Sequence, residues 1–114
     1  MSKLSKDLVA ASSVPIILSI LAGGEHYGYQ IIQKVRDVSG GDIEWADGML
    51  YPILHKLEDK GMIESYWQVS DNGRKRKYYL IRPEGREVLA VERTNWSVIH
   101  VLLQNLWNPQ PHSI

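Results

Sequence analysis

The spacing of apolar residues along the chain predicts a mainly helical protein that begins with a central helix. Over Lys6–Ala22, apolar side chains cover most of the helix circumference, which is typical of a helix buried among other elements. Pro15 either kinks this helix or opens a shorter helix that Ser12 or Ser13 would cap. A pair of glycines then ends the element.

Two further helices are predicted close behind the first. Apolar residues recur at helical spacing over Tyr27–Ser39, and a second pair of glycines follows. After a short extended link at Ile43–Ala46, Asp47 is expected to cap a third helix that ends at Gly61. Two helices joined by so short a link are typical of a helix-turn-helix.

From Met62 the hydrophobic period changes to two, which predicts a strand that continues to about Val69. Asn72 and Gly73 favour a tight hairpin turn because both residue types tolerate positive φ. Residues 75–81 would return as the partner strand. Pro83 suits the first turn of a last helix over residues 84–107.

Length and composition indicate one small folded domain. The chain has 114 residues, of which 44% are hydrophobic and 23% charged. The absence of cysteine excludes disulfides, thiolate metal sites and cysteine nucleophiles. The N-terminus lacks the pattern of a secretory leader, and no apolar run is long enough to span a membrane, so we expect a cytoplasmic protein with no membrane partner.

Charge is balanced overall but is unevenly distributed. The formal net charge is zero, so the chain as a whole gives no electrostatic support for nucleic-acid binding. Six basic residues between positions 71 and 86 nevertheless outnumber two acidic ones, and four of the six are consecutive in the predicted hairpin: Arg74, Lys75, Arg76 and Lys77. The hairpin should form a basic edge on a neutral body.

The order of elements predicts a winged helix-turn-helix of the α+β class, with three helices and a two-stranded β wing over residues 1–82. The outer face of the third helix is suited to a major groove about 12 Å wide. The basic residues of the hairpin are suited to phosphates or the minor groove. The candidate DNA contacts on the third helix are Gly48, Met49, Tyr51, Pro52, His55 and Lys56.

The last helix, over residues 83–107, has an apolar face too wide for the first helix alone to cover. Heptads counted from Leu89 place apolar residues at most core positions. A second copy of the chain packed through a two-fold interface would cover this face, so we predict a homodimer. The predicted interface residues are Leu89, Trp96, Ile99, Leu103 and Leu106, and residues 108–114 form a flexible tail.

These segments resemble the PadR-like transcriptional regulators. The resemblance rests on Tyr27–Ile31, Gly48–Glu58, Gly61–Ile63, Gly73–Tyr79 and Gly85. It implies a dimeric regulator, usually a repressor, that binds a palindromic operator in double-stranded DNA, and it adds Tyr27 and Tyr29 to the candidate DNA contacts. The chain departs from the family pattern at Met49, where serine or threonine is frequent, and at Arg82, where a capping threonine is common.

The resemblance also implies a ligand site. In small members with a single C-terminal helix, a tryptophan from each subunit lines a pore at the dimer interface that takes flat aromatic compounds. Trp96 occupies this place here, although packing in the dimer core is the alternative role for such a residue. The other implied ligand contacts are Leu8, Ser12, Pro15, Ser19 and Ile99.

Two other functional classes compete with a DNA-binding regulator. The chain lacks a nucleophile elbow and a phosphate loop, so we expect neither an enzyme nor a cofactor. His55, Glu58 and Asp59 share helical spacing that could hold a metal, but such trios are commonly exposed charge pairs, and we expect no metal. A winged helix that only binds proteins is the alternative function, against which the run of four cations argues.

Overall fold

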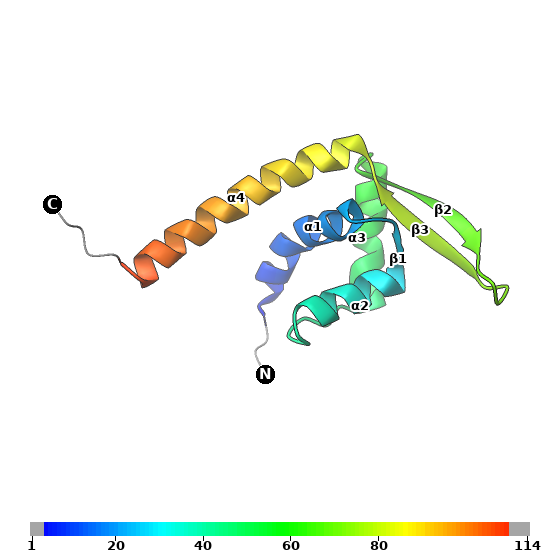
Figure 1. Ribbon diagram of the computed structural model, residues 1–114, viewed down its shortest axis with the longest axis horizontal. Helices are drawn as coiled ribbons and strands as arrows, with labels where there is room; N and C mark the ends of the chain where they lie inside the picture. The colour runs from blue at the N-terminus through cyan, green and yellow to red at the C-terminus, as the bar shows by residue number, and fades with distance from the viewer. Residues whose placement is uncertain (1–3, 110–114) are drawn as a thin grey trace.

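The computed structural model describes residues 4–109, which form four helices and a three-stranded antiparallel sheet (Figure 1). The architecture is a winged helix-turn-helix followed by a long last helix, as the sequence predicts. In chain order the elements are α1 (Lys6–Ala22), β1 (His26–Tyr27), α2 (Gly28–Val38), α3 (Asp47–Asp59), β2 (Ile63–Val69), β3 (Lys75–Ile81) and α4 (Pro83–Trp107). No helix within residues 4–109 is long and apolar enough to cross a membrane.

α1 is one continuous helix that contains Pro15, so the shorter alternative is wrong. Its cap is Ser5, whose hydroxyl accepts a hydrogen bond of 3.1 Å from the Leu8 N–H. Ser12 and Ser13 do not cap, because their hydroxyls donate to carbonyl groups in the preceding turn. The helix passes through the middle of the fold, where its inner face is fully buried.

The core joins all three helices of the helix-turn-helix to the sheet and to the start of α4. Trp45, from the extended link before α3, is only 7% exposed and belongs to this core. The buried apolar residues are Ile17, Leu18, Leu21, Ile31, Val35, Trp45, Leu50, Leu54, Leu57, Ile63, Tyr79 and Leu89.

A short third strand extends the predicted two-stranded wing. β1 pairs with β3, where His26 lies opposite Tyr79 and Tyr27 lies opposite Tyr78. Two residues are too few to produce a readable hydrophobic period, which is why the sequence pattern assigned Tyr27 to a helix. α2 begins one residue later, at Gly28. β1 therefore ties the base of the wing to the start of α2.

Neither α3 nor α4 begins with a side-chain capping hydrogen bond. Asp47 is the first residue of α3 rather than its cap, which is Ala46 with no side-chain hydrogen bond. In the first turn its carboxylate still interacts favourably with the helix dipole. Arg82 is the N-cap residue of α4 but makes no capping hydrogen bond with its side chain; its guanidinium pairs instead with Glu64 at 3.5 Å and Glu84 at 3.7 Å. Arg82 thus links β2 to the last helix.

α4 is packed at its start and projects away from the body further along (Figure 1). Gly85 lies against Met62 and Ile81 so closely that an added Cβ would come within 2.9 Å of the Ile81 side chain. The prediction that Leu89 belongs to an uncovered face is wrong, because it is buried in the core of the single chain. Of the predicted tail, residues 110–114 lie outside the described residues.

Candidate nucleic-acid interface

The outer face of α3 is the first part of the predicted DNA-binding surface. Its side chains are accessible because the opposite face, which contains Leu50, Leu54 and Leu57, is buried in the core. Of the six predicted contacts on this helix, Met49 is half-buried and packs against the core. The other five are exposed: Gly48, Tyr51, Pro52, His55 and Lys56.

Tyr51 also has a packing role at the crossing of α2 and α3. Gly28, the first residue of α2, is buried against the tyrosine ring, and a Cβ at Gly28 would lie 2.7 Å from the ring carbon Cζ. Burial, followed by the nearby charge of Asp47, raises the pKa of Tyr51 above its usual value. Its hydroxyl therefore keeps its proton at neutral pH and can donate a hydrogen bond.

The four cations of the wing lie in two different environments. The Arg76 guanidinium stacks 4.5 Å from the centre of the Tyr27 ring, and the Lys77 ammonium lies 3.9 Å from a carboxylate oxygen of Glu58. Arg74 and Lys75 lie nearer the hairpin turn and form no ion pair within the described part of the chain. Arg74 and Lys75 therefore have the freest charges for an external anion.

A groove of about 790 Å³ joins α3 to the wing, and we call it the α3–wing groove. Eight of the twelve predicted DNA contacts line it: Tyr27, Tyr29, Tyr51, His55, Arg74, Lys75, Arg76 and Lys77. It does not include Gly48, Met49, Pro52 or Lys56, which belong to other parts of the α3 surface. The lining also includes Gly28, Trp67 and Tyr79, which were not among the predicted contacts.

A cluster of three tyrosines, of which Tyr27 also lines the α3–wing groove, fixes the wing to the body. Tyr78 lies between Tyr66, which stacks on it at 5.7 Å between ring centres, and Tyr27, which meets it edge-on at 5.4 Å. The Tyr66 hydroxyl donates a hydrogen bond of 2.5 Å to Glu25, and this bond is the main reason why the pKa of Tyr66 is raised to about 12. These contacts hold the wing beside α2 and so set the shape of the α3–wing groove.

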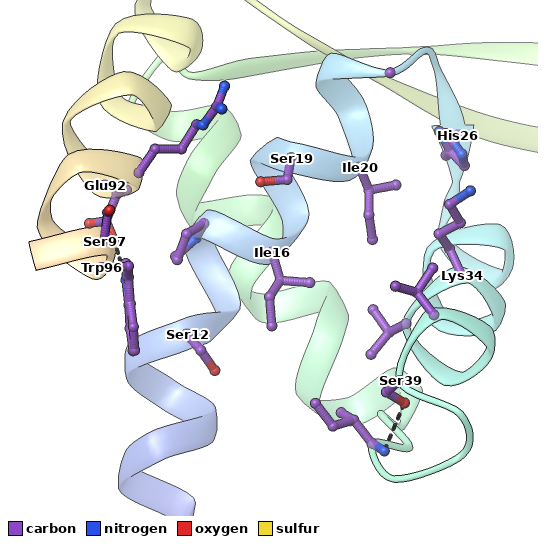
Figure 2. Close-up of a pocket in the computed structure, with 16 residues that line it drawn as sticks. Ser12, Ile16, Ser19, Ile20, His26, Lys34, Ser39, Glu92, Trp96 and Ser97 are labelled. Carbon is purple, nitrogen blue, oxygen red and sulfur yellow. Dashed lines mark hydrogen bonds between the residues drawn. The ribbon is translucent and has the colours of Figure 1, made fainter. Parts of the chain in front are cut away.

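A second, larger concave surface of about 950 Å³ lies along α1, between α2 and α4 (Figure 2), and we call it the α1–α4 groove. Four of the six predicted ligand contacts line it: Ser12, Pro15, Ser19 and Trp96. Leu8 and Ile99 do not, and both are exposed in the single chain. The indole N–H of Trp96 donates a hydrogen bond of 3.0 Å to Glu92, which fixes the orientation of the ring.

His55, Glu58 and Asp59, which share helical spacing on α3, do not form a cluster of metal ligands. Glu58 accepts a hydrogen bond of 2.6 Å from the Ser65 hydroxyl and lies near Lys77, so it belongs to the contact between α3 and the wing. No three histidine, aspartate or glutamate side chains of residues 4–109 are grouped as metal ligands would be.

The fold and the groove define the class of protein: a winged helix-turn-helix with a basic wing beside its third helix. The sequence matches the Transcriptional regulator PadR-like family over residues 17–91, which is more than half of the chain. The chain belongs to this family. It is therefore a transcriptional regulator rather than an enzyme.

Individual relatives agree with this assignment. A transcriptional regulator from Mycobacterium tuberculosis is 36% identical over 77 residues, which is 68% of each chain. A PadR-like transcriptional regulator from Bacillus cereus has a solved structure that superposes with a TM-score of 0.80, at 27% identity, covering 92% of this chain and 100% of that one. A regulator from Clostridium thermocellum gives a TM-score of 0.79 at 28% identity, covering 88% and 97%.

Proposed function

We propose that this regulator binds a palindromic DNA operator as a homodimer, acts as a repressor, and is released by a flat aromatic ligand. The observation that carries DNA binding is the α3–wing groove, because it places Tyr51 and His55 from the exposed face of α3 and the four wing cations around one concave surface. With α3 in the major groove, the wing lies over the adjacent phosphates. The α3 side chains would then read bases while the wing cations attract the backbone.

Dimerisation is supported by the second half of α4. Residues 94–107 contain no aspartate, glutamate, lysine or arginine, and large apolar side chains there are exposed in the single chain. Ile99 is 50% exposed and Leu106 is 65% exposed. A second copy packed on this face by a two-fold axis would bury them and would present two α3 helices to two half-sites of a palindrome.

Ligand binding is supported by the α1–α4 groove. Trp96 presents a flat ring at one side of it, and apolar side chains such as Ile16 and Ile20 lie along its floor (Figure 2). A planar ligand between the Trp96 rings of two subunits would be stabilised by stacking, at about 0.5 to 1.5 kcal/mol beyond burial. α4 follows the wing strand β3 after only Arg82, so a shift of this helix changes the position of the wing.

The first test is binding of the full chain to the DNA upstream of its own gene, because such regulators often control themselves or a neighbouring gene. Affinity should fall steeply as salt is raised, since binding releases counterions from the phosphates. A winged helix that only binds proteins would show no salt-dependent DNA affinity. A gel-shift titration at several salt concentrations separates the two functions.

Neutralising Arg74 and Lys75 together, as Arg74→Gln with Lys75→Gln, should weaken binding to operator and random DNA alike. Each lost phosphate contact reduces the slope of log affinity against log salt by about 0.9, so the slope should flatten by roughly two units. Lys6→Gln with Arg36→Gln removes two exposed cations outside the α3–wing groove and should leave the slope unchanged. An unaltered slope in the wing variant would refute the role of the wing.

His55→Ala should reduce operator affinity while random DNA is bound almost as before. His55 is exposed on α3 and lines the α3–wing groove, and it is a cleaner target than Tyr51, which also packs on Gly28. A good base contact accounts for about 1 to 3 kcal/mol of discrimination. Lys60→Ala, at the exposed residue that follows α3 and lies outside the α3–wing groove, should not change the ratio of the two affinities. Equal losses on both DNAs would contradict base reading by α3.

A further inference from the structure

Trp67 has an unusual position for so large an apolar side chain. It is 64% exposed in the middle of β2. Residues two apart in a strand share a face, and the preceding residues of this face, Ile63 and Ser65, are respectively buried in the core and hydrogen-bonded to Glu58 of α3. Trp67 therefore lies on the side of the wing that faces α3, beyond the point where the body covers it.

Its surroundings are those of a binding surface. Trp67 lines the α3–wing groove together with Tyr51 and His55 from α3, and it lies opposite Lys77 in the strand register. Val69, the next residue on the same face, is 59% exposed and lies opposite Lys75. The inner face of the wing thus combines an apolar ridge with a row of cations.

The indole N–H of Trp67 also differs from that of Trp96. The Trp96 N–H donates to Glu92, whereas no protein acceptor within residues 4–109 receives a hydrogen bond from the Trp67 indole N–H. An indole N–H can only donate. Trp67 therefore presents a free donor and an apolar ring to whatever enters the α3–wing groove.

We propose that Trp67 contacts the sugar-phosphate backbone of DNA, with its ring against a deoxyribose and its N–H donating to a phosphate oxygen. This inference rests on the proposed DNA binding. In DNA, one phosphate backbone separates the major groove from the adjacent minor groove. If α3 lies in the major groove and the wing lies at the minor groove, that backbone enters the α3–wing groove of the protein. Phosphate and sugar contacts position a protein without reading sequence.

An uncharged contact has a signature that differs from that of the wing cations. Because Trp67 neutralises no phosphate, the number of counterions released on DNA binding does not change when Trp67 is removed. Trp67→Ala should therefore weaken operator and random DNA by the same factor, about threefold to tenfold, as expected for one hydrogen bond with its packing. The salt slope should stay that of the parent protein. Trp67→Phe keeps an aromatic ring but lacks the N–H donor, so its affinity for both DNAs should lie between that of the parent and that of Trp67→Ala.

The experiment measures fluorescence anisotropy of labelled operator and random duplexes with the full-length parent, Trp67→Ala, Trp67→Phe and Gln68→Ala at four salt concentrations. Gln68 is exposed on the opposite face of the same strand, so the Gln68→Ala variant should bind both DNAs with the affinity of the parent. A parent that binds neither duplex refutes the proposed function. If the parent binds DNA, three results would refute the role of Trp67 without refuting DNA binding. They are full affinity in Trp67→Ala, a loss of operator binding alone, and a changed salt slope.

Discussion

A chain that ends after Asn95 should be monomeric and should bind a palindromic operator at least a hundredfold more weakly than the full chain, as expected when two tethered half-site contacts become independent. The deletion removes the uncharged second half of α4, which contains Trp96, Ile99 and Leu106. The helix-turn-helix core should survive, because α4 contributes to it through Gly85 and Leu89 near its start. Sedimentation velocity at micromolar concentration measures the change in mass.

Two further variants separate loss of the interface from loss of folding. A chain that ends after Asn108 keeps the whole of α4 and should remain a dimer. Ile99→Glu places a charge on a side chain that is half-exposed in the single chain, so the monomer tolerates it while a dimer that buries it does not. A full-length parent that sediments as a monomer would refute the proposed assembly.

Trp96→Ala should abolish ligand-induced release from DNA while the protein remains a folded dimer that binds its operator. The ring forms one side of the α1–α4 groove, and its removal deprives a planar ligand of its stacking surface on both subunits. The measurement is operator release by a planar acridine dye, followed by anisotropy of labelled DNA. By linkage, DNA should weaken dye binding by the same factor by which the dye weakens DNA binding.

Quenching of tryptophan fluorescence alone does not test the ligand site, because Trp45, Trp67 and Trp107 also emit. The matched control is Trp107→Ala, which removes an exposed tryptophan of the same helix outside the α1–α4 groove and should retain dye-induced release. If Trp96→Ala still binds the dye and still releases DNA, the ligand occupies another part of the protein.

The sequence alone determined the order and the ends of most elements. Apolar residues recur with a clear period in α2, α3 and β2, α1 is apolar on nearly all sides, and turn residues such as Asn72-Gly73 have strong local preferences, so these elements could be identified without tertiary information. The same local patterns identified the basic run at Arg74–Lys77 and the exposed face of α3. These properties depend on neighbours in the chain.

Only the tertiary structure decided which of these side chains meet. β1 is too short to have a period, and its pairing with β3 depends on a contact about fifty residues away. Arg76 and Lys77 follow each other in one basic run, yet Tyr27 and Glu58 give them partners that no local pattern predicts. Leu89 continues an apolar heptad but is buried by its own chain, because the N-terminal turns of α4 pack on the body. Alternation in β2 placed Trp67 on one face of a strand, and only the packing of α3 against that face brings it into a groove.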